Sequence, residues 1–439
     1  MAIPYSSTVT GGAFKGALSS NFLQTDLAKK SFAATIARLM PNGSATLFGL
    51  TSLLGDETAV AYEHGYFAKT MIFPSVTLTA NAPTVGTTVA STVQENITVA
   101  STANIVVGMI LGVMQSTGVP TNENLLVLAV VSSTVLTVNR NIGGLSQTPN
   151  NTILAALASG MTAYQVGTAY EEASVRPTAL GIIPVRITNL TQIFRNTWTV
   201  SDSVRATQVI AGDSNVAENR MDCMAFHASD IEKAIFFGYK SFLSVNNQPL
   251  RTMDGLISIL NNAANYPPIF AGLTNVNTAG ATTTNDQFEA MLDPVFNQAT
   301  DPKTANERLL FVGGAAKRVI NGIGKKSGTY YLVDQQTSWG LQFSEYHSTR
   351  GNFKIIEHPL FNSNASWAKM AVCVDPASIR LAYLGDRKTQ NREFNVNMKD
   401  VDPVDNGIDA VGGTLTTECT LMVKNPAANA IIYNLTAAA

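Results

Sequence analysis

The stretch with the most obvious potential for chemistry is Gly322-Ile-Gly324-Lys325-Lys326-Ser327. A phosphate-binding loop follows the pattern G-x-x-x-x-G-K-[ST], in which backbone amides and the lysine hold the phosphates. Here Val319 stands where the first glycine is needed, and Lys326 stands where Ser or Thr is needed. Because the pattern fails at two positions, we interpret this stretch as a polar loop and not as a nucleotide site.

Residues that could bind a metal or act as a nucleophile are scattered along the chain. Glu63-His64 and Glu357-His358 are adjacent pairs, not the H-E-x-x-H spacing that places two histidines on one helix face. There is no G-x-S-x-G motif, and no cysteine lies in a CxxC pair. We therefore predict isolated structural histidines, no disulfide framework, a reducing compartment, no metal, no cofactor and no enzymatic activity. The residues concerned are His64, His227, His347, His358, Cys223, Cys373 and Cys419.

Charged side chains have two possible roles. The acidic pairs Asp56-Glu57, Glu171-Glu172 and Asp400/Asp402 could serve acid–base chemistry or bind a cation, although solvated turns explain them equally well. Four arginines recur at spacings of nine and ten along an extended segment, as expected of a ribbon that meets acidic groups on another subunit; simple solubility is the alternative. The candidate inter-subunit contacts are Arg176, Arg186, Arg195, Arg205, Glu171 and Glu172.

Composition limits the class of protein. The 439 residues suffice for several structural units, but only 14% are charged, against roughly 25% in typical soluble domains. Low charge fits a subunit whose surface is covered by neighbours, and it also fits a monomeric Thr/Asn-rich β protein. The formal net charge of −2, without a basic run, argues against a protein that grips nucleic acid through its phosphates. The beginning of the chain indicates no signal peptide, and no apolar run is long enough for a membrane span.

The N-terminal half is expected to be rich in strands. Residues 1–45 contain one modest amphipathic stretch, which predicts an arm with a short helix, and 47–80 turn to alternating β-branched residues. Short strand-like runs from about 92 to 170 predict a small β-barrel or sandwich. Within it, LLVLAVVSSTVLTVNRNIGG (125–144) places Leu136, Val138 and Arg140 on one face of a strand. Residues 171–211 then predict an extended ribbon.

The second half begins with the best helix signal. Apolar residues recur at spacings of three and four from Met221 to Phe242, which predicts a helix of about 30 residues over 215–245. Asn246, Asn247 and Pro249 supply its stop, and Gly238 inside it requires close packing to be tolerated. Alternating strands and helices then predict an α/β or α+β unit at 250–385, and the tail from 386 is strand-like.

The order of these elements resembles the tailed-bacteriophage major capsid proteins of the Hong Kong 97-type fold. The resemblance is carried by the stretches LFGLTSLLG, YEHGYFAKTMIFPSVTLTA, LLVLAVVSSTVLTVNRNIGG, NLTQIFRNTWTVSDSVRATQ and GGTLTTECTLMVKNPAANAIIYNL, together with the long helix. It is closest to a family that carries a small β-domain inserted in the extended loop.

The resemblance implies an α+β fold with these parts: an N-terminal arm (1–45), an extended loop and its base (46–91 and 171–212), a β-rich insertion (92–170), a spine helix (213–249) and returning strands (386–439) of a peripheral domain, and an axial domain (250–385). It further implies hexamers and pentamers of an icosahedral shell around double-stranded DNA, with possible portal, scaffold or decoration proteins, in a virion assembled in the host cytoplasm. An encapsulin-like nanocompartment shell and a β-rich phage tail or adhesion protein are the alternatives.

Overall fold

The computed structural model describes residues 54–69, 73–82, 88–89, 94–140, 151–152, 156–207, 215–262, 275–297, 300–301, 306–327, 333–338, 341–394 and 410–438. The chain forms two compact units. One comprises Met1–Tyr66 with Arg186–Ala439, and the other comprises Phe67–Val185. The first unit mixes helices with sheets and the second is built of strands, so the predicted α+β class is confirmed. The predicted arm, 1–45, lies outside the described residues.

A five-stranded sheet in the first unit is organised by one long strand. Strand β23 pairs with β12 along one edge, from Gln192 opposite Cys419 to Ser201 opposite Ala410. Its other edge is shared by β21 and β22, and β1 runs parallel to β21. The strands are β1 (Gly55–Ala59), β12 (Gln192–Ser201), β21 (Ile379–Leu384), β22 (Gln390–Phe394) and β23 (Ala410–Val423).

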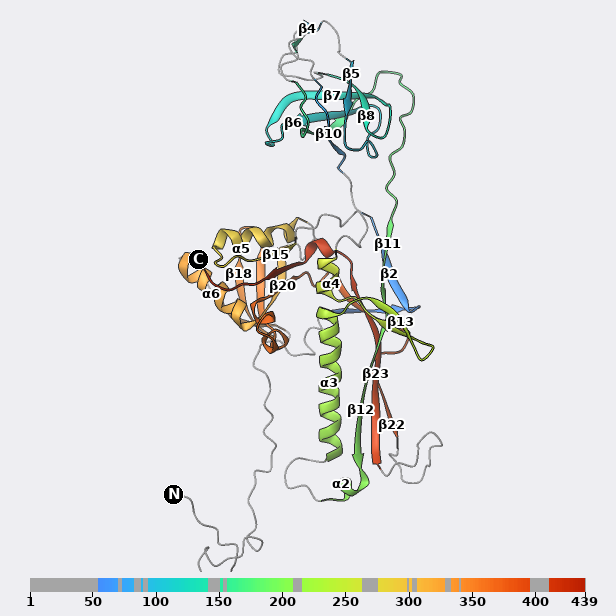
Figure 1. Cartoon of the computed structure of the whole chain (residues 1–439), viewed down its shortest axis with the longest axis vertical. Coiled ribbons are helices and arrows are strands. Elements are labelled where there is room, and N and C mark those ends of the chain that lie inside the picture. The colour runs from blue at the N-terminus through green and yellow to red at the C-terminus, as the bar shows by residue number, and fades with distance from the viewer. Residues whose placement is uncertain are drawn as a thin grey trace, which may run out of the picture. The chain divides into compact units, whose positions relative to one another are not determined.

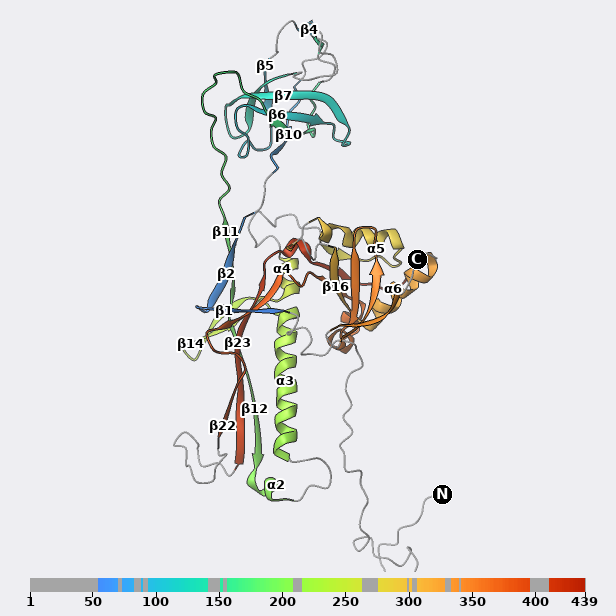
Figure 2. The ribbon, with the colours of Figure 1, turned by 180° about the vertical axis from the view of Figure 1, so that it is seen from behind.

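Helix α3 (Asn215–Phe237) runs alongside β12, as both views show (Figures 1 and 2). Its C-terminal half buries Ile231, Ile235 and Phe236 in a core shared with both large sheets. Of the predicted stripe, Ala228, Ile231 and Ile235 are buried, because a spacing of three and four places these side chains on one face. The short helix α2 (Asp202–Ala206) precedes it.

The predicted length of this helix was wrong. The helix has 23 residues and ends before Gly238, where a Cβ atom would lie 2.7 Å from the carbonyl oxygen of Met253. The chain then forms a hairpin of β13 (Ser241–Val245) and β14 (Gln248–Thr252). Asn246 and Asn247, which we interpreted as a helix stop, form its turn with φ of 51° and 58°. Positive φ at both central residues is what a type I′ hairpin turn requires.

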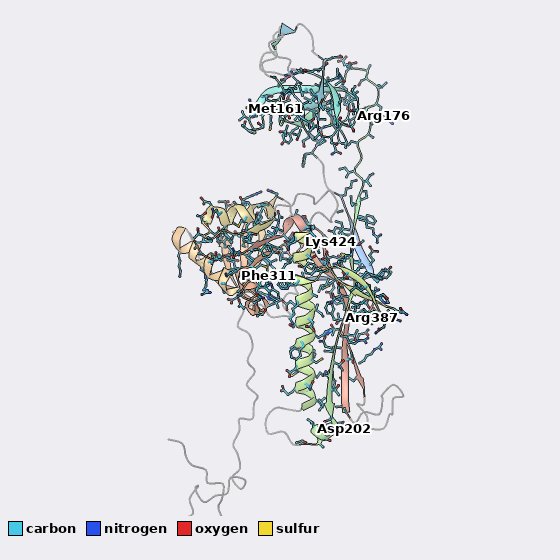
Figure 3. The ribbon with its side chains drawn as sticks, viewed as in Figure 1. Met161, Arg176, Asp202, Phe311, Arg387 and Lys424 are labelled. Atoms are coloured by element: carbon cyan, nitrogen blue, oxygen red, sulfur yellow. The ribbon has the colours of Figure 1, made fainter. Side chains whose placement is uncertain are left out.

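A seven-stranded sheet forms the remainder of the first unit, in the order β15-β24-β20-β16-β19-β18-β17. Alternation along β16 sends Leu310 and Val312 into one core, with residues of α5 and α6, and Phe311 into the core shared with α3. Both faces of this sheet are therefore covered (Figure 3 labels Phe311). The strands are β15 (Val276–Thr278), β16 (Glu307–Val312), β17 (Val333–Ser338), β18 (Leu341–His347), β19 (Asn352–Glu357), β20 (Ala371–Val374) and β24 (Ala430–Tyr433). The helices are α4 (Leu256–Asn261), α5 (Asn285–Leu292) and α6 (Gly314–Ser327), with 3-10 turns η4 (Asp293–Phe296), η6 (Pro359–Ser363), η7 (Trp367–Lys369) and η8 (Pro426–Ala428).

The two sheets exchange strands across the boundary that the sequence suggested near residue 385. Strand β21 lies within the predicted axial range, yet it pairs with β23 of the five-stranded sheet. Strand β24 lies within the predicted returning strands, yet it pairs with β15 and β20 of the seven-stranded sheet. These pairings join residues far apart in the chain, which local patterns do not reveal.

The second unit is a closed six-stranded barrel in the order β3-β10-β6-β7-β8-β5. Closure follows from the Leu78–Val99 bridge and from two hydrogen bonds, Thr79 N–H to Thr98 O (2.9 Å) and Ala100 N–H to Thr77 O (2.9 Å). The predicted barrel is thus present. Its strands are β3 (Ser75–Thr77), β5 (Gln94–Thr98), β6 (Met109–Met114), β7 (Pro120–Val130), β8 (Val135–Asn139) and β10 (Thr162–Thr168), and a short ribbon pairs β4 (Thr88–Val89) with β9 (Asn151–Thr152).

The barrel interior obeys the period of two that strands impose. Met109, Leu111 and Val113 of β6 are buried, whereas the residues between them are half-buried. Leu136 and Val138 are buried on the face that the sequence indicated. Arg140, predicted on that same face, is also buried.

Candidate subunit-interface surfaces

The four arginines singled out from the sequence do not converge on one site. Arg186 lies on β11 (Val185–Leu190), which pairs with β2 (Glu63–Ala68), and its Nη2 is 3.4 Å from Oε2 of Glu63. A hydrogen bond with Thr188 lowers the pKa of Glu63, partly opposed by desolvation and aided by the charge of Arg186. Arg205 pairs with Asp202 within α2, at 3.7 Å. These two arginines therefore have acidic partners in their own chain.

The other two arginines are exposed. Arg195 lies on the exposed face of β12 beside Ile193, whose side chain is 45% exposed, and no described residue forms an ion pair with it. Arg176 lies in a run from 168 to 181 in which every residue is exposed, together with Glu171 and Glu172 (Figure 3). That these six residues contact another subunit stays a prediction.

The run after the barrel is extended and unpaired. Residues 175–184 form no strand within the described part of the chain, although Val175 and Ile183 are 88% and 82% exposed. Exposed backbone polar groups and apolar side chains of this kind are typical of a segment that is ordered by a partner. This is the region that the sequence predicted as the returning limb of an extended loop.

The hairpin β13–β14 is an apolar surface that the sequence interpretation missed. Leu243 faces Leu250 across the hairpin, and Val245 is the next residue on the same face. Their side chains are 53%, 46% and 49% exposed. A two-stranded hairpin is marginal by itself in water, so an exposed apolar face on it indicates a missing partner. The sequence does show two alternating runs around Asn246-Asn247, a pattern typical of a hairpin. We instead assigned the first of these runs to the predicted helix.

The base of this hairpin is fixed by a buried carboxylate. Glu418 on β23 is fully buried and accepts hydrogen bonds from Arg251 Nη2 of β14 (3.0 Å), Arg387 Nη1 (2.6 Å) and Thr191 Oγ1 (2.9 Å). The guanidinium of Arg251 also lies 5.0 Å from the ring centre of Tyr62. Charge-assisted hydrogen bonds of this kind restrict orientation, so the hairpin is held at a defined angle to the five-stranded sheet.

A second apolar surface continues the stripe of α3. Met221 and Met224 belong to the predicted stripe, yet they are 55% and 44% exposed, because in this half of the helix Cys223 and Val216 are the residues that pack, against Trp198 and Leu415. Phe226, outside that stripe, is 66% exposed. Together with the hairpin, these residues leave the first unit with extensive apolar surface.

The buried histidines serve structure. His358 Nε2 is 2.5 Å from Oε1 of Glu232 on α3, and His358 Nδ1 accepts a hydrogen bond from the amide of Leu360. Burial raises the pKa of Glu232, partly opposed by the hydrogen bond with His358. Both residues are fully buried among aromatic rings, so the pair joins helix α3 to the seven-stranded sheet and is closed to any substrate.

The other candidates for chemistry are equally enclosed. Burial raises the pKa values of the Cys373 and Cys419 thiols to about 12, which disfavours the thiolate that a nucleophile requires. Gly322–Ser327, interpreted as a polar loop, is instead the last part of helix α6, because Val319, Ile320 and Ile323 pack into the core at helical spacing. The interpretation of this stretch as a loop was therefore wrong.

The described residues contain no group of three or more His, Cys, Asp or Glu side chains placed to hold a metal ion. Within the same part of the chain, no helix is both long enough and apolar enough to cross a membrane.

Buried polar pairs, enclosed thiols and uncovered apolar surfaces are typical of a structural subunit that assembles with other chains. Comparison with known proteins shows to which family this subunit belongs. The SU10 major capsid protein family matches residues 13–436. A major capsid protein of Pseudomonas phage PaMx41 is 36% identical over 431 residues, covering 96% of each chain. The chain therefore belongs to the SU10 major capsid protein family, and it is a phage major capsid protein, as predicted.

Solved capsid structures are also similar. The capsid structure of cyanophage P-SCSP1u is 10% identical, with a TM-score of 0.46 over 96% of this chain and 97% of that chain. A structure from Mycobacterium phage Bobi is 10% identical, with a TM-score of 0.43 over 93% and 96% of the two chains. Of the two alternatives, neither the encapsulin-like shell nor the tail or adhesion protein agrees with the family assignment, which covers nearly the whole chain.

Proposed function

We propose that this chain forms the hexamers and pentamers of an icosahedral shell that encloses double-stranded DNA. The observation that carries the proposal is the combination of a rigid frame with uncovered apolar surfaces, above all the Leu243/Leu250/Val245 face, held in place through Glu418. A closed shell needs heterologous contacts that close, and obligate interfaces of this kind total roughly 2,000 to 5,000 Å².

The predicted domain roles fit this frame. The five-stranded sheet with α3 serves as the peripheral domain, and the seven-stranded sheet with α5 and α6 serves as the axial domain at capsomer centres. Segments 46–91 and 171–212 form the extended loop and its base, and the exposed run around Val175 and Ile183 lies on a neighbouring subunit. Arg176 and Arg195, which lack acidic partners among the described residues, are the two predicted contact residues best placed to meet carboxylates of a neighbour.

The shell encloses DNA without binding it tightly. A formal net charge of −2 and the lack of a basic run in the sequence argue against strong phosphate neutralisation, which raises affinity with each counterion released. Portal, scaffold and decoration proteins would assist a shell assembled in the host cytoplasm, and the chain performs no catalytic step.

Electron microscopy of particles formed by the purified full chain tests the proposal. Icosahedral shells or hexameric and pentameric rings are expected, with nuclease-resistant double-stranded DNA inside particles from infected cells. A chain that stays monomeric at high concentration, with and without phage assembly proteins, contradicts it.

A further inference from the structure

The barrel unit is almost devoid of charge. Between Lys69 and Glu171 the sequence contains only three charged residues, Glu95, Glu123 and Arg140, whereas 14% of the whole chain is charged. No lysine, aspartate or histidine occurs in that span. A domain of this size normally keeps itself soluble and apart from its copies with many surface charges of both signs.

All three charges are sequestered in one cluster. Arg140 Nε and Nη2 donate to the two carboxylate oxygens of Glu123 at 2.8 and 2.9 Å, and Nη1 donates to Oε2 of Glu95 at 3.0 Å. The side chains of Arg140, Glu123 and Glu95 are 0%, 8% and 14% exposed. Burial would lower the pKa of Arg140, but the two carboxylates reverse this and raise it. The outside of the barrel is therefore left essentially without charge.

One side of the barrel is mostly apolar as well as uncharged. Its β10–β6–β7 outer face carries the apolar side chains of Tyr164, Val166, Ile110, Met114, Leu126 and Leu128, and the uncharged polar Asn124 lies among them opposite Gly112. Val166 is the extra residue at an irregularity of the β10–β6 pairing, it is 68% exposed, and Tyr164 is 43% exposed. Bulges of this kind redirect a side chain, and here Val166 lies over Gly112, where an added Cβ would be 2.8 Å from Val166 Cγ2.

From these observations we propose that the β10–β6–β7 outer face binds the barrel of a second copy of this chain in the assembled shell. The inference rests on the proposed function, because a shell holds many barrels close together. Identical copies carry identical charges, so any net surface charge would repel the neighbouring barrel; an uncharged exterior removes that repulsion. A contact too small to hold two free subunits suffices inside a shell, since the effective concentration of a tethered neighbour is in the millimolar range.

The chemistry of the face disfavours other occupants. Nucleic acid requires basic groups, and this span contains only the buried Arg140. A partner chosen by charge would need charged groups to recognise, and the outer face has none. A decoration protein that binds by apolar contact is the competing occupant, and the experiment separates it from a second copy.

The test measures access to Val166 before and after assembly. Val166→Cys places a thiol at the centre of the face, and Thr117→Cys places a matched thiol at the exposed turn between β6 and β7. The native cysteines Cys223, Cys373 and Cys419 are buried, so the parent chain gives a low background. Maleimide labelling is followed in shells assembled from the full chain alone and in capsomers dissociated from them.

Protection confined to Val166→Cys supports the proposal. We expect it to label at least about tenfold more slowly in shells than in capsomers, whereas Thr117→Cys labels at the same rate in both, because an accessible thiolate is needed for reaction. Equal labelling of Val166→Cys in both states overturns the proposal while leaving the shell function intact. Protection found only in virions from infected cells also overturns it, because a different protein then covers the face. Failure of every variant and the parent to form shells contradicts the proposed function itself.

Discussion

Replacing Leu243 with Asp is predicted to block assembly while leaving the subunit folded. Leu243 is already 53% exposed in the single chain, so the substitution removes little internal packing and should change subunit stability by no more than about 0.5 kcal/mol. Covering the exposed half of a leucine in a subunit contact stabilises that contact by about 1 kcal/mol, half of the range for full burial. Placing a carboxylate there adds a desolvation penalty of several kcal/mol. A loss of roughly 3 kcal/mol weakens each contact more than about a hundredfold.

Sedimentation through a sucrose gradient, with electron microscopy of the fractions, measures the yield of shells. The matched control is Ser244→Asp, which adds the same charge to the opposite face of the hairpin, where Ser244 is exposed opposite Pro249. Circular dichroism melts of the unassembled fraction verify folding. Shell yields for Leu243→Asp that equal those of the parent and of Ser244→Asp would refute the assignment of this face to an interface.

Three further predictions concern buried polar groups. Glu418→Gln leaves Arg251 and Arg387 without their carboxylate and should lower the free energy of unfolding by roughly 2 to 4 kcal/mol. This loss is smaller than the largest values for buried ion pairs because Arg387 is half-exposed. An unchanged midpoint of urea unfolding would contradict the prediction. Burial lowers the pKa of His227, partly opposed by a nearby carboxylate, so the unfolded chain binds the proton first as pH falls. The contribution of neutral His227 to stability is complete above about pH 6.5 and declines below it. The parent chain should therefore melt at a lower temperature at pH 5.5 than at pH 7.5, and His227→Gln should reduce this difference. An identical difference in parent and variant would contradict the assignment to His227. Arg140→Met leaves Glu95 and Glu123 without their cationic partner inside the barrel, which should lower the stability of the barrel by about 3 to 5 kcal/mol. Amide hydrogen exchange of residues 94–140 should therefore accelerate, and unaltered exchange rates would contradict a stabilising role of this cluster.

Local periodicity predicted much of the fold, because it reflects which side chains are buried. The period of two around Leu136 and Val138 indicated a barrel strand, and the period near 3.6 from Ala228 to Ile235 indicated a helix that packs on a sheet. Both patterns arise within one element, so no knowledge of distant partners was needed.

Features that depend on distant residues were not predictable from these patterns. The barrel closes through Leu78 and Val99, and β24 joins a sheet whose other strands precede it by many residues. The end of α3 was missed for a related reason: Gly238 is required by the carbonyl of Met253, which comes close only in the folded chain. A turn pair such as Asn246-Asn247 fits both a helix stop and a hairpin until that contact decides between them.

The candidate contact residues show what spacing alone leaves open. The spacing of Arg186 and Arg205 suggested acidic partners on another subunit, and the structure adds a carboxylate beside each within the chain, Glu63 across a ribbon and Asp202 one helical turn away. The exposed apolar face of the hairpin became recognisable only from the structure, which shows the side chains that the core leaves uncovered.

On the proposed function, this chain is a building unit whose uncovered surfaces bind copies of itself. Cryo-electron microscopy of particles assembled from the full chain tests it most directly. We expect a closed icosahedral shell in which the Leu243/Leu250/Val245 face of every subunit is covered by a neighbouring subunit. A shell in which that face is open to solvent, or a concentrated preparation that forms no rings or shells, would contradict it.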